Sequence, residues 1–215
     1  MTSRDTVLAA VRTAIAGATV PQVQRTYDLG LDLDERGLLE LFVERVNDYR
    51  ADVRVVDPAH LARSVGAVLA QYGASSVVVP ADLDPAWLTT VTCPVIRDDP
   101  PLDPRRLDEI SAVVTASAVG IALTGTIILD ARQAQGRRVI SLIPDLHVCV
   151  VNAASVVATV PEAMPRLDPT RPMTWISGPS ATSDIELDRV EGVHGPRRLV
   201  VLVVEAVAED EPAGQ

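Results

Sequence analysis

The stretch VRVVDPAHLARSVGAVLAQYGASSVVV, residues 53–79, decides the fold class. It begins with a short apolar run, continues with apolar residues at helical spacing, and ends in a second apolar run of strand length. A strand, a helix and a strand in this order are typical of a parallel sheet whose strands are joined by crossover helices. The stretch therefore predicts an α/β protein with a parallel sheet as its core.

Downstream of this stretch the pattern becomes richer in strands. The expected elements are helices over 84–91 and 153–164 and strands over 94–96, 112–116, 120–123, 126–129, 138–143, 147–151, 173–176 and 199–204. Residues 110–129 are uncharged for about the length that crosses a bilayer, but serines, threonines and glycines interrupt them. We interpret this segment as two buried strands joined near Gly120, and we expect no membrane span.

The N-terminal quarter carries two amphipathic helical patterns. Apolar residues fall on one face of a helix over 3–16, which Gly17 ends, and Asp34 suits the N-cap of a second helix that runs to about Tyr49. We predict an N-terminal helical extension over 1–52, an α/β domain over 53–207, and a disordered acidic tail over 208–215.

The composition excludes several classes of function. A formal net charge of −10 opposes binding to the phosphates of nucleic acids. All 19 basic residues are arginine, so neither a Schiff-base lysine nor the lysine of a P-loop is present. Any anion must therefore be bound by arginine, by hydroxyl groups or by backbone N–H groups.

The cysteines and histidines provide no recognisable metal or cluster motif. Cys93 and Cys149 lie far apart in apolar surroundings, so we predict buried free thiols in a cytoplasmic protein. Without a CxxC pair the chain cannot by itself hold a cysteine-ligated iron–sulfur cluster. His147 and His194 lack the paired spacing of a metal site, so we predict no bound metal.

Three stretches combine glycine, hydroxyl and ionisable residues near the ends of predicted strands, where open α/β sheets place their ligand crevice. In the first, LTGTI, Thr124 and Thr126 flank Gly125. Backbone N–H groups and two hydroxyls in such a turn can form a small anion cradle without a charged side chain. A tight connection between two strands would require the same glycine, so both interpretations remain open.

The second stretch is PDLHV, in which Asp145 and His147 stand two residues apart at the start of a strand. In an extended chain this spacing places both side chains on the same face. Asp145 could then orient His147 as a general base or as a ligand-binding group. The alternative is an aspartate in a turn and a histidine whose hydrogen bonds are satisfied within the core.

The third stretch, ISGPSATSDIE at 176–186, fits the start of a capped helix. Ser183 and Glu186 have the spacing of a capping box. Because N–H groups at a helix start bind anions, four residues before the cap are candidate ligands of a carboxylate or phosphate. They are Ser177, Gly178, Ser180 and Thr182.

His194 follows this stretch and is the third candidate catalytic residue, beside Asp145 and His147. It stands between Gly192 and Gly195, and these glycines indicate a close approach of the backbone and not a filled core. The GxSxG and GxGxxG motifs are absent, so the sequence supports neither a nucleophile elbow nor a dinucleotide site.

Four segments together resemble the lactate utilisation protein C group of the LUD-domain family, in the same order and at comparable spacing. They are ERVNDYRADV (44–53), TGTIIL (124–129), SLIPDLHVCVV (141–151) and TWISGPSATSDIELDRVEGVHGPRRLVVLVV (174–204). The resemblance implies a Rossmann-type fold of the NagB/RpiA/CoA-transferase kind, with additional strands. It also implies a place in the oxidation of L-lactate to pyruvate beside partner proteins that carry iron–sulfur clusters.

One residue departs from the family pattern. Members commonly have an acidic residue immediately before the TGT, where this chain has Leu123. Three hypotheses follow: a non-catalytic or assembling subunit that binds a small carboxylate or a partner, a stand-alone enzyme acting on a hydroxy acid, sugar phosphate or acyl thioester, and a ligand-sensing or scaffold module. The absence of a carboxylate at Leu123 favours the last of these.

Overall fold

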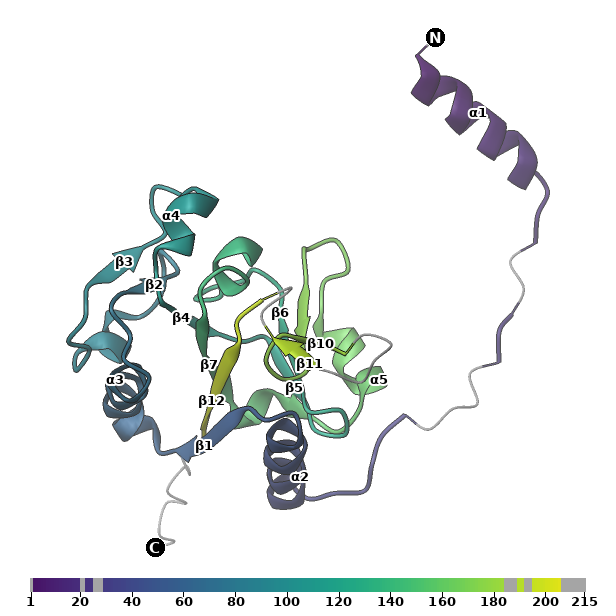
Figure 1. Cartoon of the computed structure of the whole chain (residues 1–215). Helices are drawn as coiled ribbons and strands as arrows, with labels where there is room; N and C mark the ends of the chain where they lie inside the picture. The colour runs from purple at the N-terminus through teal and green to yellow at the C-terminus, as the bar shows by residue number, and fades with distance from the viewer. Residues whose placement is uncertain (1, 20–21, 25–28, 184–188, 192–194, 206–215) are drawn as a thin grey trace, which may run out of the picture.

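A six-stranded parallel sheet forms the centre of the computed structural model, which describes residues 2–19, 22–24, 29–183, 189–191 and 195–205 (Figure 1). The strands are β1 (Asp52–Val56), β12 (Arg198–Val204), β7 (Leu146–Asn152), β4 (Ala112–Ala116), β2 (Val77–Val79) and β3 (Val95–Arg97), in this spatial order. Every neighbouring pair in the sheet is parallel. The sheet therefore has one edge at which its strands begin and one at which they end.

A second sheet packs on one face of the first. Its strands, in spatial order, are β8 (Val156–Val157), β5 (Val119–Ile121), β6 (Thr126–Leu129) and β9 (Thr174–Ile176). In a separate two-stranded sheet, β10 (Ala181–Ser183) pairs antiparallel with β11 (Arg189–Glu191). The chain crosses between the two sheets through residues 117 and 118, directly after β4. Ile127 and Leu129 of the second sheet share a buried cluster with Cys149 and Val201 of the first, so the interface between the sheets is part of the core.

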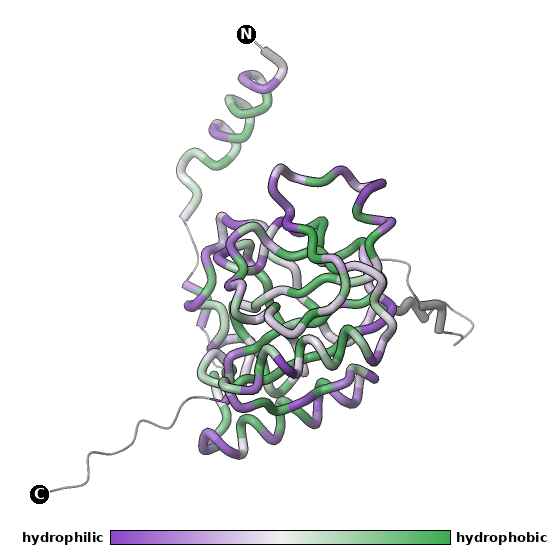
Figure 2. Tube along the Cα trace, turned by 90° about the vertical axis from the view of Figure 1, so that its left-hand side faces the viewer, coloured by the Kyte–Doolittle hydropathy of each residue, from purple (hydrophilic) through white to green (hydrophobic). Residues whose placement is uncertain are grey.

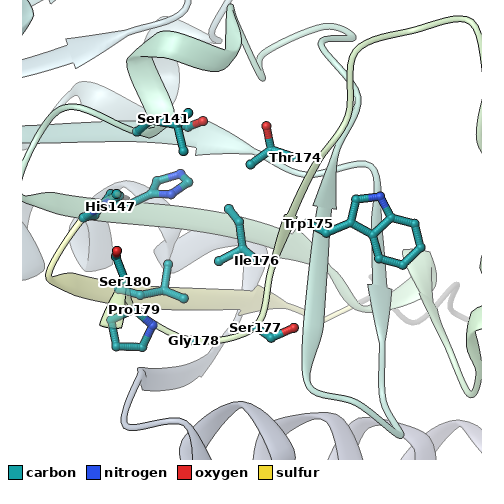
Figure 3. Close-up of a pocket in the computed structure, with 13 residues that line it drawn as sticks. Ser141, His147, Thr174, Trp175, Ile176, Ser177, Gly178, Pro179 and Ser180 are labelled. Atoms are coloured by element: carbon teal, nitrogen blue, oxygen red, sulfur yellow. The ribbon is translucent and has the colours of Figure 1, made fainter. Parts of the chain in front are cut away.

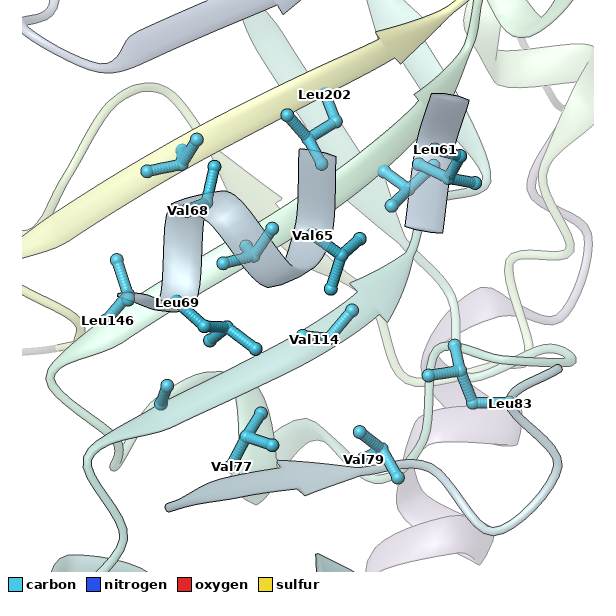
Figure 4. Packing of buried hydrophobic residues seen from close by; sticks show 14 of the residues in the cluster. Leu61, Val65, Val68, Leu69, Val77, Val79, Leu83, Val114, Leu146 and Leu202 are labelled. Carbon is cyan, nitrogen blue, oxygen red and sulfur yellow. The ribbon is translucent and has the colours of Figure 1, made fainter. Parts of the chain in front are cut away.

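Two of the helices pack on the remaining faces of the core. The α-helices are α1 (Ser3–Ile15), α2 (Glu35–Asp48), α3 (Leu61–Gln71), α4 (Pro104–Asp108) and α5 (Val160–Ala163), and the short 3-10 helices are η1 (Pro58–His60), η2 (Pro85–Leu88), η3 (Arg138–Ser141), η4 (Ala153–Ser155) and η5 (Met164–Arg166). Helix α3 packs Val65 and Leu69 onto the outer face of the parallel sheet (Figure 4). Helix α2 packs Phe42 and Val46 into the cluster between the sheets.

The two faces of the parallel sheet explain its composition. In β7, Val148 and Val150 lie in the cluster beneath α3, whereas Cys149 and Val151 lie in the cluster between the sheets. A strand that is buried on both faces has no polar face, so it reads as a continuous apolar run. This is why the short runs of valine in the sequence indicate the sheet.

Helix α1 is not part of this core. Thr2 caps it in a capping box with Asp5, and none of its residues is buried. The side chains of Val7, Val11 and Ile15 are at least half exposed, and the helix stands apart from the rest of the chain (Figures 1 and 2). No helix in the described part of the chain is both long enough and apolar enough to span a bilayer.

The predicted fold class is confirmed: a parallel α/β core with additional strands and N-terminal helices. Strands predicted over 53–56, 112–116, 126–129, 147–151 and 199–204 agree with β1, β4, β6, β7 and β12 to within one residue. Asp34 caps α2 as predicted, because its side chain accepts a hydrogen bond from the Gly37 N–H. The predicted disordered tail, 208–215, lies outside the described residues.

Two predicted elements are wrong. Residues 138–143 were expected to form a strand but form η3 and a turn, which place Ile140 in a buried cluster beside β4. The predicted helix over 153–164 is divided into η4, β8 and the short α5. Val156 and Val157 pair with β5, and Pro161 starts a new helical turn, because proline is tolerated only in the first turn of a helix.

The helix predicted over 84–91 is reduced to the single turn η2, which precedes the β-branched Thr89 and Thr90. Gly120 is not the joint between two strands, because it lies inside β5. A β-carbon at Gly120 would lie 3.1 Å from the ring of Phe42, so the glycine allows α2 to approach the second sheet. The cysteines are free and Cys149 is buried, as predicted, but Cys93 is partly exposed, so the prediction that it is buried is wrong.

Candidate functional site

A pocket of about 230 Å³ lies where β9 passes the first residues of β7 and β12 (Figure 3). It is lined by Ser141, Leu142, His147, the segment from Thr174 to Ser180, Gly195, Pro196 and Leu199. We call it the SGPS pocket, after residues 177–180. His147 and Leu199 are the second residues of their strands, so the pocket lies at the edge where the parallel strands begin.

His147 forms the buried wall of the SGPS pocket. Only 1% of its surface is exposed, and its Nε2 lies 2.8 Å from the Thr115 hydroxyl on the neighbouring strand β4. Burial lowers the pKa of His147 to about 4, because the surrounding core disfavours the charged ring. The imidazole is therefore neutral at neutral pH.

Cys149 lies two residues further along β7, on the same face. Its Sγ is 3.9 Å from the Thr115 hydroxyl and 4.0 Å from the Ala116 carbonyl oxygen. Burial raises the pKa of this thiol to about 12, so the thiolate is not populated at neutral pH. Cys149 is thus a core residue and not a nucleophile.

The TGT and SGPS turns meet through their hydroxyl groups. The Thr124 and Thr126 hydroxyls lie 2.7 Å apart, and Thr126 Oγ1 lies 2.9 Å from Ser177 Oγ. In Figure 3 the Ser177 side chain points away from His147. The structure therefore brings three predicted site residues together, but their hydroxyls bond to one another.

Both glycines of these turns contact the C-terminal end of α2. Gly125 has φ +56°, and a β-carbon there would lie 2.6 Å from the carbonyl oxygen of Arg45. Gly178 has φ +81°, and its β-carbon would lie 2.4 Å from Cβ of Tyr49. Close packing and left-handed backbone thus explain both glycines.

Asp145 does not orient His147. Its carboxylate forms an ion pair with Arg197, and its carbonyl oxygen accepts a hydrogen bond of 3.1 Å from Arg198 N. In the described part of the chain, the hydrogen-bond partner of the imidazole is the hydroxyl of Thr115. The spacing of two residues correctly placed both residues at the strand start, but it did not bring their side chains together.

The remaining candidates in the described residues lie in β10 or just before it. Gly178 and Ser180 line the SGPS pocket, and Thr182 lies in β10. Ser183, predicted to cap a helix, is the last residue of β10 and pairs with Arg189 of β11. His194 and residues 184–188, with most of the predicted capping box, lie outside the described residues.

Sequence reasoning missed Ser141 and Thr174, which line the pocket with His147. Ser141 falls within the strand predicted over 138–143, so the sequence pattern did not mark it as a site residue. In the structure its hydroxyl donates to the Arg138 carbonyl oxygen at 2.9 Å. Thr174 was the first polar residue of an otherwise apolar strand, which was the one available signal. Their proximity to His147 depends on how the sheets stack, and a sequence pattern does not specify this.

Leu123, the departure from the family pattern, lies in the turn between β5 and β6. Its side chain is 47% exposed and does not line the SGPS pocket. An acidic side chain at this position would thus be directed to solvent and not to His147. In the described part of the chain, no group of three or more histidine, cysteine, aspartate or glutamate residues is arranged to hold a metal ion.

These features define a layered α/β protein with a small pocket between its two sheets, in which none of the described lining residues is charged. The LUD domain matches residues 104–204, which include the SGPS pocket. A Deinococcus radiodurans protein named lactate utilization protein C is 46% identical over 202 residues, covering 92% of this chain and 93% of the relative. The chain therefore belongs to the LUD-domain family, in the lactate utilization protein C group.

Two further comparisons agree with this assignment. A protein named lactate utilization protein C from Geobacillus thermodenitrificans is 25% identical over 217 residues, covering 88% of each chain. The crystal structure of a DUF162 family protein from Deinococcus radiodurans is similar with a TM-score of 0.69 at 43% identity, and the match covers 80% of this chain and 99% of that one. The match supports the fold described above.

Proposed function

We propose that this chain takes part in lactate utilisation as a non-catalytic or assembling subunit that binds a small hydroxy or oxo acid in the SGPS pocket. The name of the Deinococcus radiodurans relative supports the pathway, because the two chains are similar over nearly their whole length. The volume of about 230 Å³ supports the ligand class, since it is smaller than the usual pocket for a drug-sized molecule.

The position of His147 at the wall of the SGPS pocket, with its Nε2 bonded to Thr115, is the observation that carries this proposal. Thr115 occupies Nε2, so Nδ1 is the ring nitrogen left for a ligand. A general base works best when its pKa lies near the operating pH, and the pKa of His147 is about 4. Binding through a hydrogen bond is therefore favoured over proton abstraction.

The lining suits both ends of a lactate-like molecule. Leu142, Ile176 and Leu199 offer apolar surface to a methyl group. The hydroxyl of Thr174 is a donor suited to a carboxylate. None of the described lining residues carries a formal charge, so we expect hydrogen bonds to determine the affinity.

Calorimetry of the full chain with L-lactate and with pyruvate tests the binding step. We expect one of the two to bind, and His147→Gln and Thr174→Val to weaken that binding about tenfold, the effect of losing one hydrogen bond to a charged group. His60→Gln, on the exposed turn η1, is the matched control and should bind as the original chain does. A chain that binds neither acid, or variants with unchanged affinity, would contradict the proposal.

We further propose that iron–sulfur partner proteins in the cytoplasm carry the electrons released by lactate oxidation, and that this chain binds no redox cofactor itself. The sequence supports this, since its two cysteines are 56 residues apart. The exposed apolar side chains of α1 offer a surface for such a partner. We expect co-purification with an iron-containing protein and loss of growth on lactate when the gene is deleted. Growth that survives the deletion would contradict this role.

A stand-alone enzyme is the second candidate, and His147 at a pocket wall is the feature that keeps it open. Turnover of a hydroxy acid, a sugar phosphate or an acyl thioester by the purified chain, lost in His147→Gln, would favour it. Ligand binding without turnover would instead favour a sensing module, and the absence of ligand binding would favour a scaffold.

A further inference from the structure

A second cavity lies at the edge of the sheet where the parallel strands end. Its volume is about 340 Å³, and part of its lining directly follows β2 and β3. The rest belongs to the loop after β6 and to Arg171. We call it the arginine cavity, because Arg132, Arg137 and Arg171 line it. It shares no lining residue with the SGPS pocket.

Arg137 is fixed in place by a buried carboxylate. Its Nε and Nη2 each donate to Asp98 at 2.6 Å, and Nη2 also donates to the Leu102 carbonyl oxygen at 2.9 Å. The Asp98 side chain is only 4% exposed, whereas that of Arg137 is 42% exposed. One side of the guanidinium is thus bound to the protein, and Nη1 has no acceptor within the described residues.

Arg132 and Arg171 lie on either side of Asp130, whose buried carboxylate pairs electrostatically with Arg132 but accepts no hydrogen bond within the described residues. Nε of Arg132 lies 2.8 Å from the Asp130 carboxylate, and its Nη2 donates to the Arg166 carbonyl oxygen. Nε and Nη2 of Arg171 donate to the carbonyl oxygens of Asp130 and Ala131. Nη1 of each residue again has no acceptor in the described part of the chain. Three arginines of one cavity therefore use the same edge for the fold and leave the same nitrogen for a ligand.

The carboxylates in the lining are already engaged by the protein. Asp82 accepts a hydrogen bond of 3.0 Å from the Ala134 N–H, and Asp98 accepts from Arg137 and from the Leu102 N–H. Each carboxylate is thus hydrogen-bonded within the fold, as Nη2 of each arginine is. The three arginines are matched by three carboxylates, since the buried Asp130 behind the lining pairs with Arg132, so what favours an anion is the Nη1 groups left facing the cavity and not a net positive charge.

The loop that carries Arg132 and Arg137 has an unusual backbone. Ala131 and Ala134 have φ of 57° and 59°, and Gly136 has φ of 69°. Alanine rarely adopts this left-handed conformation, because its β-carbon crowds the following carbonyl. Such strain persists where the surrounding structure holds it and is concentrated at binding sites. Here it occurs between the arginines of the cavity.

We propose that the arginine cavity binds a small oxyanion, a molecule with a phosphate or carboxylate group, through Nη1 of these three arginines. The cavity lies at the carboxyl ends of β2 and β3, which is where parallel α/β sheets commonly bind ligands. Guanidinium groups already oriented by the fold lose little freedom on binding, and they match planar or tetrahedral oxyanions.

Calorimetry of the full chain with inorganic phosphate and, separately, with malonate tests this proposal. We expect at least one to bind, and the preferred probe identifies the source of the oxyanion. Gln133 lines the cavity, and the described structure shows no hydrogen bond of its side chain. Gln133→Glu should therefore abolish binding by repulsion without breaking a structural contact. Arg132→Lys and Arg171→Lys should weaken binding about tenfold or more.

Two controls separate this site from the rest of the molecule. Arg36→Gln removes an exposed arginine on α2 and should leave phosphate and malonate affinity unchanged. His147→Gln should also leave it unchanged, so failure of the SGPS pocket proposal would be distinguishable from failure of this one. No binding of either probe by the original chain, or binding that Gln133→Glu leaves intact, would overturn the proposal.

Discussion

The SGPS pocket and the arginine cavity lie at opposite edges of one parallel sheet, and they differ in the charge and burial of their polar groups. At the edge where the strands begin, burial lowers the pKa of His147 and keeps its imidazole neutral. At the carboxyl edge charge is kept and fixed, since Asp98 and Asp130 hold the guanidinium groups. One sheet thus supports two kinds of polar site, which differ in depth and in the charges around them.

This difference has a physical cause in the layers. The amino edge of β7 lies between two sheets, where water is excluded and an ion would be poorly solvated. The ends of β2 and β3 instead join loops at the surface, where Arg132 and Arg137 are more than 40% exposed. The two sites should therefore respond differently to packing changes, pH and salt.

The largest expected effect is on the contact between α2 and the TGT turn beside the SGPS pocket. Gly125→Ala combines a left-handed alanine with a collision against the Arg45 carbonyl, so it should destabilise the fold by roughly 2–5 kcal/mol. Gly73→Ala is the matched control, because Gly73 has φ +66° with no atom within 4 Å of its β-carbon. Chemical denaturation measures both. An equal loss in the two variants would show that the contact with α2 is unimportant.

A pH titration should separate His147 from the carboxylates. Burial lowers the pKa of His147 from 6.5 to about 4, so below pH 6.5 the unfolded chain binds a proton that the folded chain does not. Stability present above pH 6.5 is then lost as pH falls toward 4, by about 3 kcal/mol in total. His147→Gln should lack this part of the loss. Parallel stability curves for the two proteins from pH 7 to 4 would contradict a buried neutral imidazole.

Salt should distinguish two substitutions, one at each edge of the sheet, that lower the free energy of unfolding by similar amounts. Arg137→Gln breaks the pair with Asp98, whereas Thr115→Val removes a neutral partner of His147, and each should cost about 1–3 kcal/mol at low salt. Only the first loss should shrink in 1 M sodium chloride, because salt screens the exposed guanidinium. Denaturation at two salt concentrations measures this. A salt-dependent Thr115→Val, or a salt-independent Arg137→Gln, would remove the distinction.

The smallest effect is expected outside both sites. Deletion of residues 2–24 should change the free energy of unfolding by less than about 0.5 kcal/mol, because no residue of α1 is buried. Phe42→Ala in α2, which is fully buried, should cost about 3–5 kcal/mol in the same assay. A large loss on deletion would show that α1 packs against the core in solution.

The sequence predicted the parallel core well because its strands are buried on both faces, as in β4 and β7. It failed at 138–143, where apolar content indicated burial but could not show whether a neighbouring strand was available. The SGPS pocket was half predicted: His147 and Ser180 came from motifs, whereas Thr174 approaches them only through sheet stacking. The arginine cavity left no pattern, since Arg132, Arg137 and Arg171 combine from loops and acquire their partners in the folded chain.

Helix α2 has a mechanical consequence that its packing alone does not reveal. The segment before residue 35 leads into its first turn, and its last turn and the following Tyr49 contact Gly125 and Gly178. At 14 residues it is a rod about 21 Å long. Tension applied to the extension, by a bound protein or by an optical trap, would be transmitted along this rod to the two turns beside the SGPS pocket. The N-terminal segment and the turns beside the SGPS pocket are thus connected to opposite ends of α2.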